Sequence, residues 1–103
     1  MCRIFAGQDP ANYACHTRSL RLAGHVTSIR LEAKFWEILD EIAEEQGMTT
    51  PKFLSLLYDE VMEINPEMHN FASLLRVSCL NYTLDRAGVM ERARGELAAA
   101  AAE

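Results

Sequence analysis

The amino-acid sequence predicts a mainly α-helical protein with a short β element near its N-terminus. Two changes of pattern support this prediction. Apolar and polar residues alternate within residues 19–32, as they do in half-exposed strands. From residue 35 onwards, the apolar residues recur at the three- and four-residue spacing of amphipathic helices. With 103 residues, of which 50% are hydrophobic, the chain is long enough for one domain with a modest core.

The predicted β structure lies within residues 2–32. Residues 2–6 are expected to form a short strand that ends at Gly7 and at the turn signal Asp9-Pro10. After Thr17, apolar and polar residues alternate on both sides of Gly24, which suits a turn between two strands. The alternating residues are Ser19, Leu20, Arg21 and Leu22 before the glycine, and Ser28, Ile29, Arg30 and Leu31 after it.

Two helices are predicted next, with a turn between them. The first helix has its apolar stripe within residues 35–43, and Gly47 stands where a helix end favours a residue with positive φ. The second helix opens with a threonine cap, Thr49 or Thr50, followed by Pro51 in its first turn. Its apolar residues continue to Ile64.

The rest of the chain is predicted to add a third helix and a tail. Asn65-Pro66 repeats the start signal of a helix, and Gly88 can end it. Residues 89–103 include five consecutive alanines and are expected to form a fraying, partly helical tail. The predicted segments are a basic N-terminal arm or strand (1–24), a strand with two helices (25–64), the additional helix (65–88) and the Ala-rich tail (89–103).

The formal net charge of −5 is unevenly distributed. Residues 1–32 contain four arginines against two acidic residues, whereas residues 33–64 contain two lysines against eight acidic residues. A basic N-terminal segment therefore precedes an acidic helical body. This polarity suits a protein that contacts a polyanion with one edge only.

Several classes of protein are not supported by the sequence. The three cysteines form no CxxC pair, which argues against the disulfide framework of a secreted protein. Neither a signal-peptide core nor an apolar stretch of about 18 residues is present, so we expect a cytoplasmic protein with no membrane partner. The three histidines lack the spacing of a zinc site, and no nucleophile–base pair is evident. We therefore expect no enzyme activity, no metal and no cofactor.

The order of strand, helix, glycine-containing turn and helix across residues 26–64 resembles the ribbon-helix-helix family, which includes the Arc and MetJ repressors. The matching segments are Ser28–Leu31, the helix of residues 35–46, the turn Gly47–Thr50 and the helix from Pro51. Residues 18–32 also look like a bacterial subfamily of short ribbon-helix-helix proteins. The resemblance implies a ribbon-helix-helix core at 25–64 with an added third helix.

The resemblance also implies an intertwined homodimer. A lone strand leaves its backbone groups unpaired, so the strands of two copies are expected to pair antiparallel about a two-fold axis. The preceding strand, residues 18–22, could instead pair with residues 26–31 within one chain. One face of the ribbon should pack on the helices, and Thr27, Ile29 and Leu31 suit it.

The opposite face of the ribbon enters the DNA major groove in the family that the chain resembles. The resemblance implies that Arg30 contacts guanine, that Ser28 forms adaptable hydrogen bonds and that Val26 touches a thymine methyl. The family also places the start of its second helix on phosphate. The implied phosphate contacts are Thr49, Thr50 and Lys52, and Arg18 and Arg21 could extend the basic face as arm contacts.

Two functions remain open at the level of the sequence. The first is a DNA-binding transcriptional regulator that uses a dimeric two-stranded ribbon in the major groove, favoured by the alternating basic strand. The second is a dimeric protein-interaction module or antitoxin on the same fold without strong DNA binding, favoured by the net charge of −5 and by Pro51. Its protein partner could dock on the acidic helices, where residues 37–45 carry most of the acidic side chains.

Overall fold

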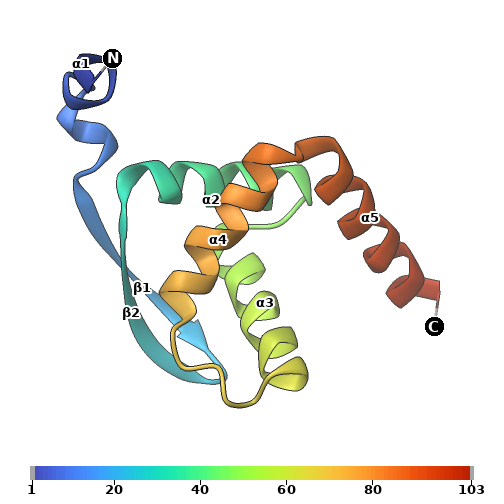
Figure 1. The fold of residues 1–103 in the computed structure, drawn as a ribbon. Coiled ribbons are helices and arrows are strands. Elements are labelled where there is room, and N and C mark those ends of the chain that lie inside the picture. The colour runs from blue at the N-terminus through green and yellow to red at the C-terminus, as the bar shows by residue number, and fades with distance from the viewer. Residues whose placement is uncertain (1, 103) are drawn as a thin grey trace.

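The computed structural model describes the backbone of residues 2–102 and the side chains of residues 2–96 and 99. These residues form a β-hairpin and a set of helices, three of which pack on one side of the hairpin, as Figure 1 shows. The mainly helical class with a short N-terminal β element is therefore confirmed. The elements are α1 (Cys2–Ala6), a 3-10 turn (Pro10–Asn12), β1 (Cys15–Leu22), β2 (His25–Glu32), α2 (Ala33–Glu45), α3 (Thr50–Ile64), α4 (Phe71–Leu84) and α5 (Arg86–Ala102).

The hairpin is formed within one chain. β1 and β2 pair antiparallel along their whole length, from Cys15 opposite Glu32 to Leu22 opposite His25. The two-residue turn between them has a φ of 51° at Ala23 and 83° at Gly24. Positive φ at both central residues matches the turn type whose twist suits tight hairpins. β2 is the strand that was expected to pair with a second copy. It already has β1 as an intrachain neighbour on one edge, so the expectation of a lone strand was wrong.

The inner face of the hairpin supplies part of the hydrophobic core. Ile29 and Leu31 are buried, as predicted, and Trp36 donates a hydrogen bond of 2.8 Å from Nε1 to the backbone oxygen of His16. Thr27 shares this face but is exposed, since it lines a cleft of about 240 Å³ beside Tyr58. The main cluster of buried residues comprises Leu20, Leu22, Ile29, Leu31, Trp36, Leu39, Leu54, Leu75 and Cys79.

The turn between α2 and α3 forms as the sequence predicts. Gly47 has a φ of 71°, which favours glycine just beyond a helix end. Thr49 caps α3, because its hydroxyl oxygen accepts a hydrogen bond of 3.3 Å from the amide of Lys52. Pro51 occupies the first turn, where the missing amide would have no intrahelical partner.

The start of the next helix differs from the prediction. Asn65 ends α3 and Pro66 lies in the loop after it. α4 begins after Asn70, whose side-chain oxygen accepts a hydrogen bond of 3.0 Å from the amide of Ser73. Helical structure is interrupted at Asp85, between α4 and α5. Gly88 therefore lies inside α5 rather than at the end of the preceding helix.

Both ends of the described chain are helical. Residues 2–6 were expected to be a strand but form α1, where all five residues are exposed and no neighbouring strand is available to pair with them. α5 includes most of the predicted tail, in keeping with the high helix propensity of alanine. Met90 anchors α5 against Ile42 and Tyr82. None of the helices in residues 2–102 is both long and apolar enough to cross a membrane.

Candidate nucleic-acid interface

The outer face of the hairpin consists of the side chains that point away from the helices. These residues lie in directly opposed pairs, and all of them are exposed. The pairs are Thr17 with Arg30, Ser19 with Ser28, and Arg21 with Val26. The structure therefore brings the predicted residues Val26, Ser28 and Arg30 onto one surface. It adds Thr17 and Ser19, which the sequence-based assignment missed although they follow from the same alternation and the two-residue turn.

The outer face is basic because it carries Arg21 and Arg30. The only acidic residue of the hairpin lies at the end of β2 and is paired with an arginine. This residue is Glu32, and its Oε1 accepts hydrogen bonds of 2.8 and 3.1 Å from the guanidinium of Arg76 in α4. The hydrogen bond from Arg76 holds the pKa of Glu32 below its ordinary value. Arg21 donates a hydrogen bond of 3.2 Å to the backbone oxygen of Gly24 and remains exposed, as does Arg30.

Arg18 lies on the inner face, where its guanidinium is engaged within the chain. It donates hydrogen bonds of 2.8 and 3.0 Å to the two carboxylate oxygens of Asp40 and stacks 4.4 Å from the centre of the Trp36 ring. The hydrogen bonds raise the pKa of Arg18 and lower that of Asp40. The structure thus separates Arg18 from Arg21, which the sequence-based assignment had grouped together as arm contacts.

The start of α3 is tied to the same cluster. Thr50 donates a hydrogen bond of 2.6 Å to Asp40 and is half-buried, whereas Thr49 and Lys52 are exposed. Two of the first amides are already used, since the amide of Lys52 donates to the side chain of Thr49 and that of Phe53 to its backbone oxygen. Pro51 has no amide hydrogen. The side chains of Thr49 and Lys52 are therefore better placed for an anion than the backbone amides are.

The acidic helical surface is partly neutralised by α5. Arg86 forms ion pairs with Glu45 and, at 3.8 Å, with Glu41 on α2. Glu37 and Glu44 are exposed on the same helix. This surface would repel a polyanion, whereas the outer face of the hairpin carries Arg21 and Arg30.

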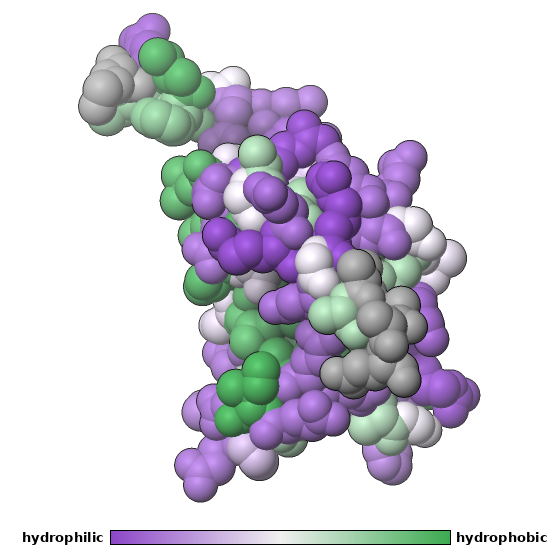
Figure 2. Space-filling view, turned by 90° about the vertical axis from the view of Figure 1, so that its right-hand side faces the viewer, coloured by the Kyte–Doolittle hydropathy of each residue, from purple (hydrophilic) through white to green (hydrophobic). Residues whose placement is uncertain are grey.

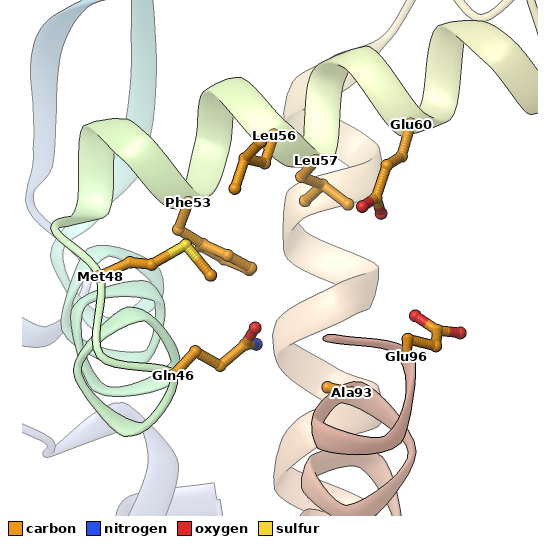
Figure 3. A pocket seen from close by; sticks show the side chains of 8 residues that line it. All are labelled: Gln46, Met48, Phe53, Leu56, Leu57, Glu60, Ala93 and Glu96. Atoms are coloured by element: carbon orange, nitrogen blue, oxygen red, sulfur yellow. The ribbon is translucent and has the colours of Figure 1, made fainter. Parts of the chain in front are cut away.

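A groove between α3 and α5 forms a second feature of the surface (Figure 3). It encloses a cavity of about 230 Å³, and the side chains of Phe53 and Leu57 point into it. Glu60 and Glu96 lie at its rim, on α3 and α5 respectively. Two carboxylates at the rim disfavour a nucleic acid there and suit a cationic ligand better.

Comparisons with known proteins agree with this geometry. A family model described as a ribbon-helix-helix domain matches residues 15–83, which include the hairpin and extend nearly to the end of α4. The structure is similar to that of an uncharacterized protein from Bordetella pertussis Tohama I, with 44% sequence identity and a TM-score of 0.80. The similarity covers 85% of this chain and 70% of that one. No curated protein sequence matches the chain.

Proposed function

Since this chain belongs to the ribbon-helix-helix family, we propose that it is a DNA-binding transcriptional regulator whose hairpin enters the major groove. The family is typically non-enzymatic, and its fold typically binds DNA. The observation that most supports the proposal is the outer face itself. It offers two arginines and three hydroxyl side chains, with no acidic residue among its six members. Two paired strands fit the width of the major groove.

The residues of the outer face have distinct roles in this proposal. Arg30 contacts guanine O6 and N7 with its two-pronged guanidinium, and Val26 packs against a thymine methyl. Ser28 and its cross-strand neighbour Ser19 form adaptable hydrogen bonds to base edges. Arg21, near the turn, is close to the edge of the ribbon and supports it through phosphate contacts.

The phosphate contacts assigned to the start of α3 divide by their surroundings. Lys52 and Thr49 bind backbone phosphate beside the groove, since both are exposed. Thr50 acts indirectly, because its hydroxyl group is hydrogen-bonded to Asp40 and fixes the start of α3 against the hairpin. Arg18 also acts indirectly, because its guanidinium donates hydrogen bonds to the same carboxylate.

The protein binds DNA as a homodimer in this proposal, as ribbon-helix-helix proteins generally do. Within residues 2–102, β1 pairs with one edge of β2, and no other strand lies on the second edge. The pairing of β2 with the same strand of a second copy would satisfy the open backbone groups and form a four-stranded sheet. The two central β2 strands would then be the ribbon that enters the groove, with a β1 strand on either side of them. The outer residues would then contact two related half-sites.

Titration of fluorescent duplexes from a selected oligonucleotide pool, at two salt concentrations, tests this function. The wild type should bind a selected sequence in a salt-dependent manner. Arg30→Ala should lose about 1–3 kcal/mol of specific binding free energy for each contact. Lys52→Ala should weaken binding to all sequences and reduce the slope against the logarithm of salt concentration by about 1. Lys34→Ala is the matched control. Lys34 forms an ion pair with Glu37 on the acidic helix, so its removal should leave the DNA affinity unchanged.

A second candidate function is a protein-interaction module or antitoxin on the same fold. The acid-rimmed groove between α3 and α5 favours it, because it suits a cationic, partly apolar segment of another protein. This alternative replaces the first if the wild type binds no selected duplex, or if Arg30→Ala binds as tightly as the wild type.

A further inference from the structure

α4 is apolar on both of its faces. Leu75, Cys79 and Tyr82 point into the core and are buried. On the opposite face Val77 and Leu80 are each 53% exposed, and Leu84 is 85% exposed. We call Val77, Leu80 and Leu84 the α4 outer stripe, since they recur at helical spacing. Helices that are apolar all round are normally covered on both faces, so this stripe is expected to have a partner.

The outer stripe lies on the same side of the molecule as the open edge of β2. α3 packs beneath β1 and α4 beneath β2, and the ion pair from Arg76 to Glu32 fixes α4 to the end of that strand. In Figure 1 α4 passes in front of α2, and in Figure 2 this side of the molecule is on the left, where hydrophobic surface gathers. α4, which carries the stripe, therefore packs against β2, the strand whose second edge is open.

The charges of the chain favour a second copy as the partner. With a net charge of −5, two copies repel each other over most of their surfaces. α4 is different, because its single charged residue is Arg76, which is already paired with Glu32. Ser73 and Asn81, which are exposed on α4 near the stripe, are polar but uncharged. Asp85, which lies beside Leu84 in a shallow hollow, is paired with Arg92 at 3.9 Å. Two such faces can therefore approach each other without placing unpaired like charges in contact.

We propose that the α4 outer stripe packs against the same stripe of a second copy and completes the homodimer interface. This inference rests on the dimer of the proposed function and identifies the surface that would stabilise it. Pairing of two short strand edges alone buries little apolar area, whereas stable specific interfaces bury about 1,200–2,000 Å² in total. A two-fold axis would repeat every contact, so each apolar side chain of the stripe contributes twice.

Sedimentation equilibrium of the full chain without DNA, over a range of concentrations, tests the interface. The wild type should have about twice the 11.6 kDa chain mass at micromolar concentration. Leu80→Glu and Leu84→Glu should each raise the dimer dissociation constant more than about tenfold. In a two-fold dimer each substitution places one new carboxylate from each copy in the interface, where its burial is costly. Ile64→Glu is the matched control, since Ile64 is 86% exposed at the end of α3, outside the stripe. It adds the same charge and should leave the dissociation constant unchanged.

Each outcome bears on the interface. A monomeric wild type, or a dimer that tolerates both stripe variants, overturns the inference. An equal increase of the dissociation constant in Ile64→Glu also overturns it. Circular dichroism should give all variants the wild-type helix content, because the replaced side chains are largely exposed. Arg30→Ala separates this inference from the proposed function, since it should weaken specific DNA binding and leave the dimer intact. A dimer that depends on the stripe but binds no DNA would retain the interface and refute the function.

Discussion

Asp40→Asn should destabilise the protein measurably, because one carboxylate joins three elements. Asp40 on α2 accepts two hydrogen bonds from Arg18 on β1 and one from Thr50 on α3. The Arg18 and Asp40 side chains are 39% and 46% exposed, so solvent screens the pair and its ionic part contributes at most about 1 kcal/mol. The charge-assisted hydrogen bond from Thr50 adds a similar amount, and we expect a total loss of about 1–2 kcal/mol.

Trp36 provides the assay for this variant. It is the only tryptophan, is buried and stacks on Arg18, so its fluorescence should follow unfolding in urea. The free energy of unfolding at neutral pH should fall by about 1–2 kcal/mol, and the melting temperature by about 4–8 °C for each kcal/mol. Glu37→Gln serves as a control, since its exposed ion pair with Lys34 at 3.4 Å should contribute less than about 0.5 kcal/mol.

The pH dependence gives a second, independent check. Hydrogen bonds from Arg18 and Thr50 lower the pKa of Asp40 in the folded protein. A carboxyl group with a lowered folded pKa stabilises the protein above its unfolded pKa of about 3.9, and this contribution disappears as pH falls through the folded value. The difference between wild type and Asp40→Asn should therefore shrink in acid. A difference below about 0.5 kcal/mol at neutral pH, or one that stays constant on acidification, would refute the reasoning.

Three further predictions concern the hairpin and the core. Ile29→Lys should unfold or strongly destabilise the protein in thermal melts, because it buries an unpaired charge costing several kcal/mol, while Ser28→Lys should be tolerated; the reverse order would mean a register shifted by one residue. Ala23→Asn should raise stability by about 1 kcal/mol, since Ala23 has a φ of 51° that asparagine adopts more easily; an unchanged or lower melting temperature would contradict this. Burial raises the pKa of Cys79 to about 11, so a thiol reagent near pH 8 should label only the other two cysteines of the folded chain, as mass spectrometry can show.

Much of the fold could be predicted from local patterns. Alternation around Gly24 placed Ile29 and Leu31 on the buried face, and Gly47 with Thr49 located the turn between α2 and α3. These signals succeed because a period-two pattern and a helix cap each depend on neighbouring residues only. The short segment 2–6 was assigned wrongly, since five residues are too few to distinguish the periods of strand and helix.

The start of α4 and the surroundings of the site required tertiary information. Asn65-Pro66 resembles a helix start, but α3 extends to Ile64 and leaves this pair in a loop. The outer residues Thr17 and Ser19 were missed because only the basic residues of this segment, Arg18 and Arg21, were assigned as contacts, although the alternation predicted a strand there. Arg18 shares its face with Leu20, a signal already present in the alternation. Its engagement by Asp40, 22 positions later, depends on how the helices pack and cannot be deduced from sequence spacing.

The most direct test of the central claim is an NMR titration of the isotopically labelled protein with a selected DNA duplex. The largest amide shifts should occur at the outer face of the hairpin, at Thr17, Ser19, Ser28 and Arg30, with smaller shifts at Lys52. The acidic surface of α2 around Glu37 and Glu44 should be unaffected. Shifts confined to the groove between α3 and α5, or a hairpin that does not respond to any selected duplex, would contradict the claim that the outer face binds DNA.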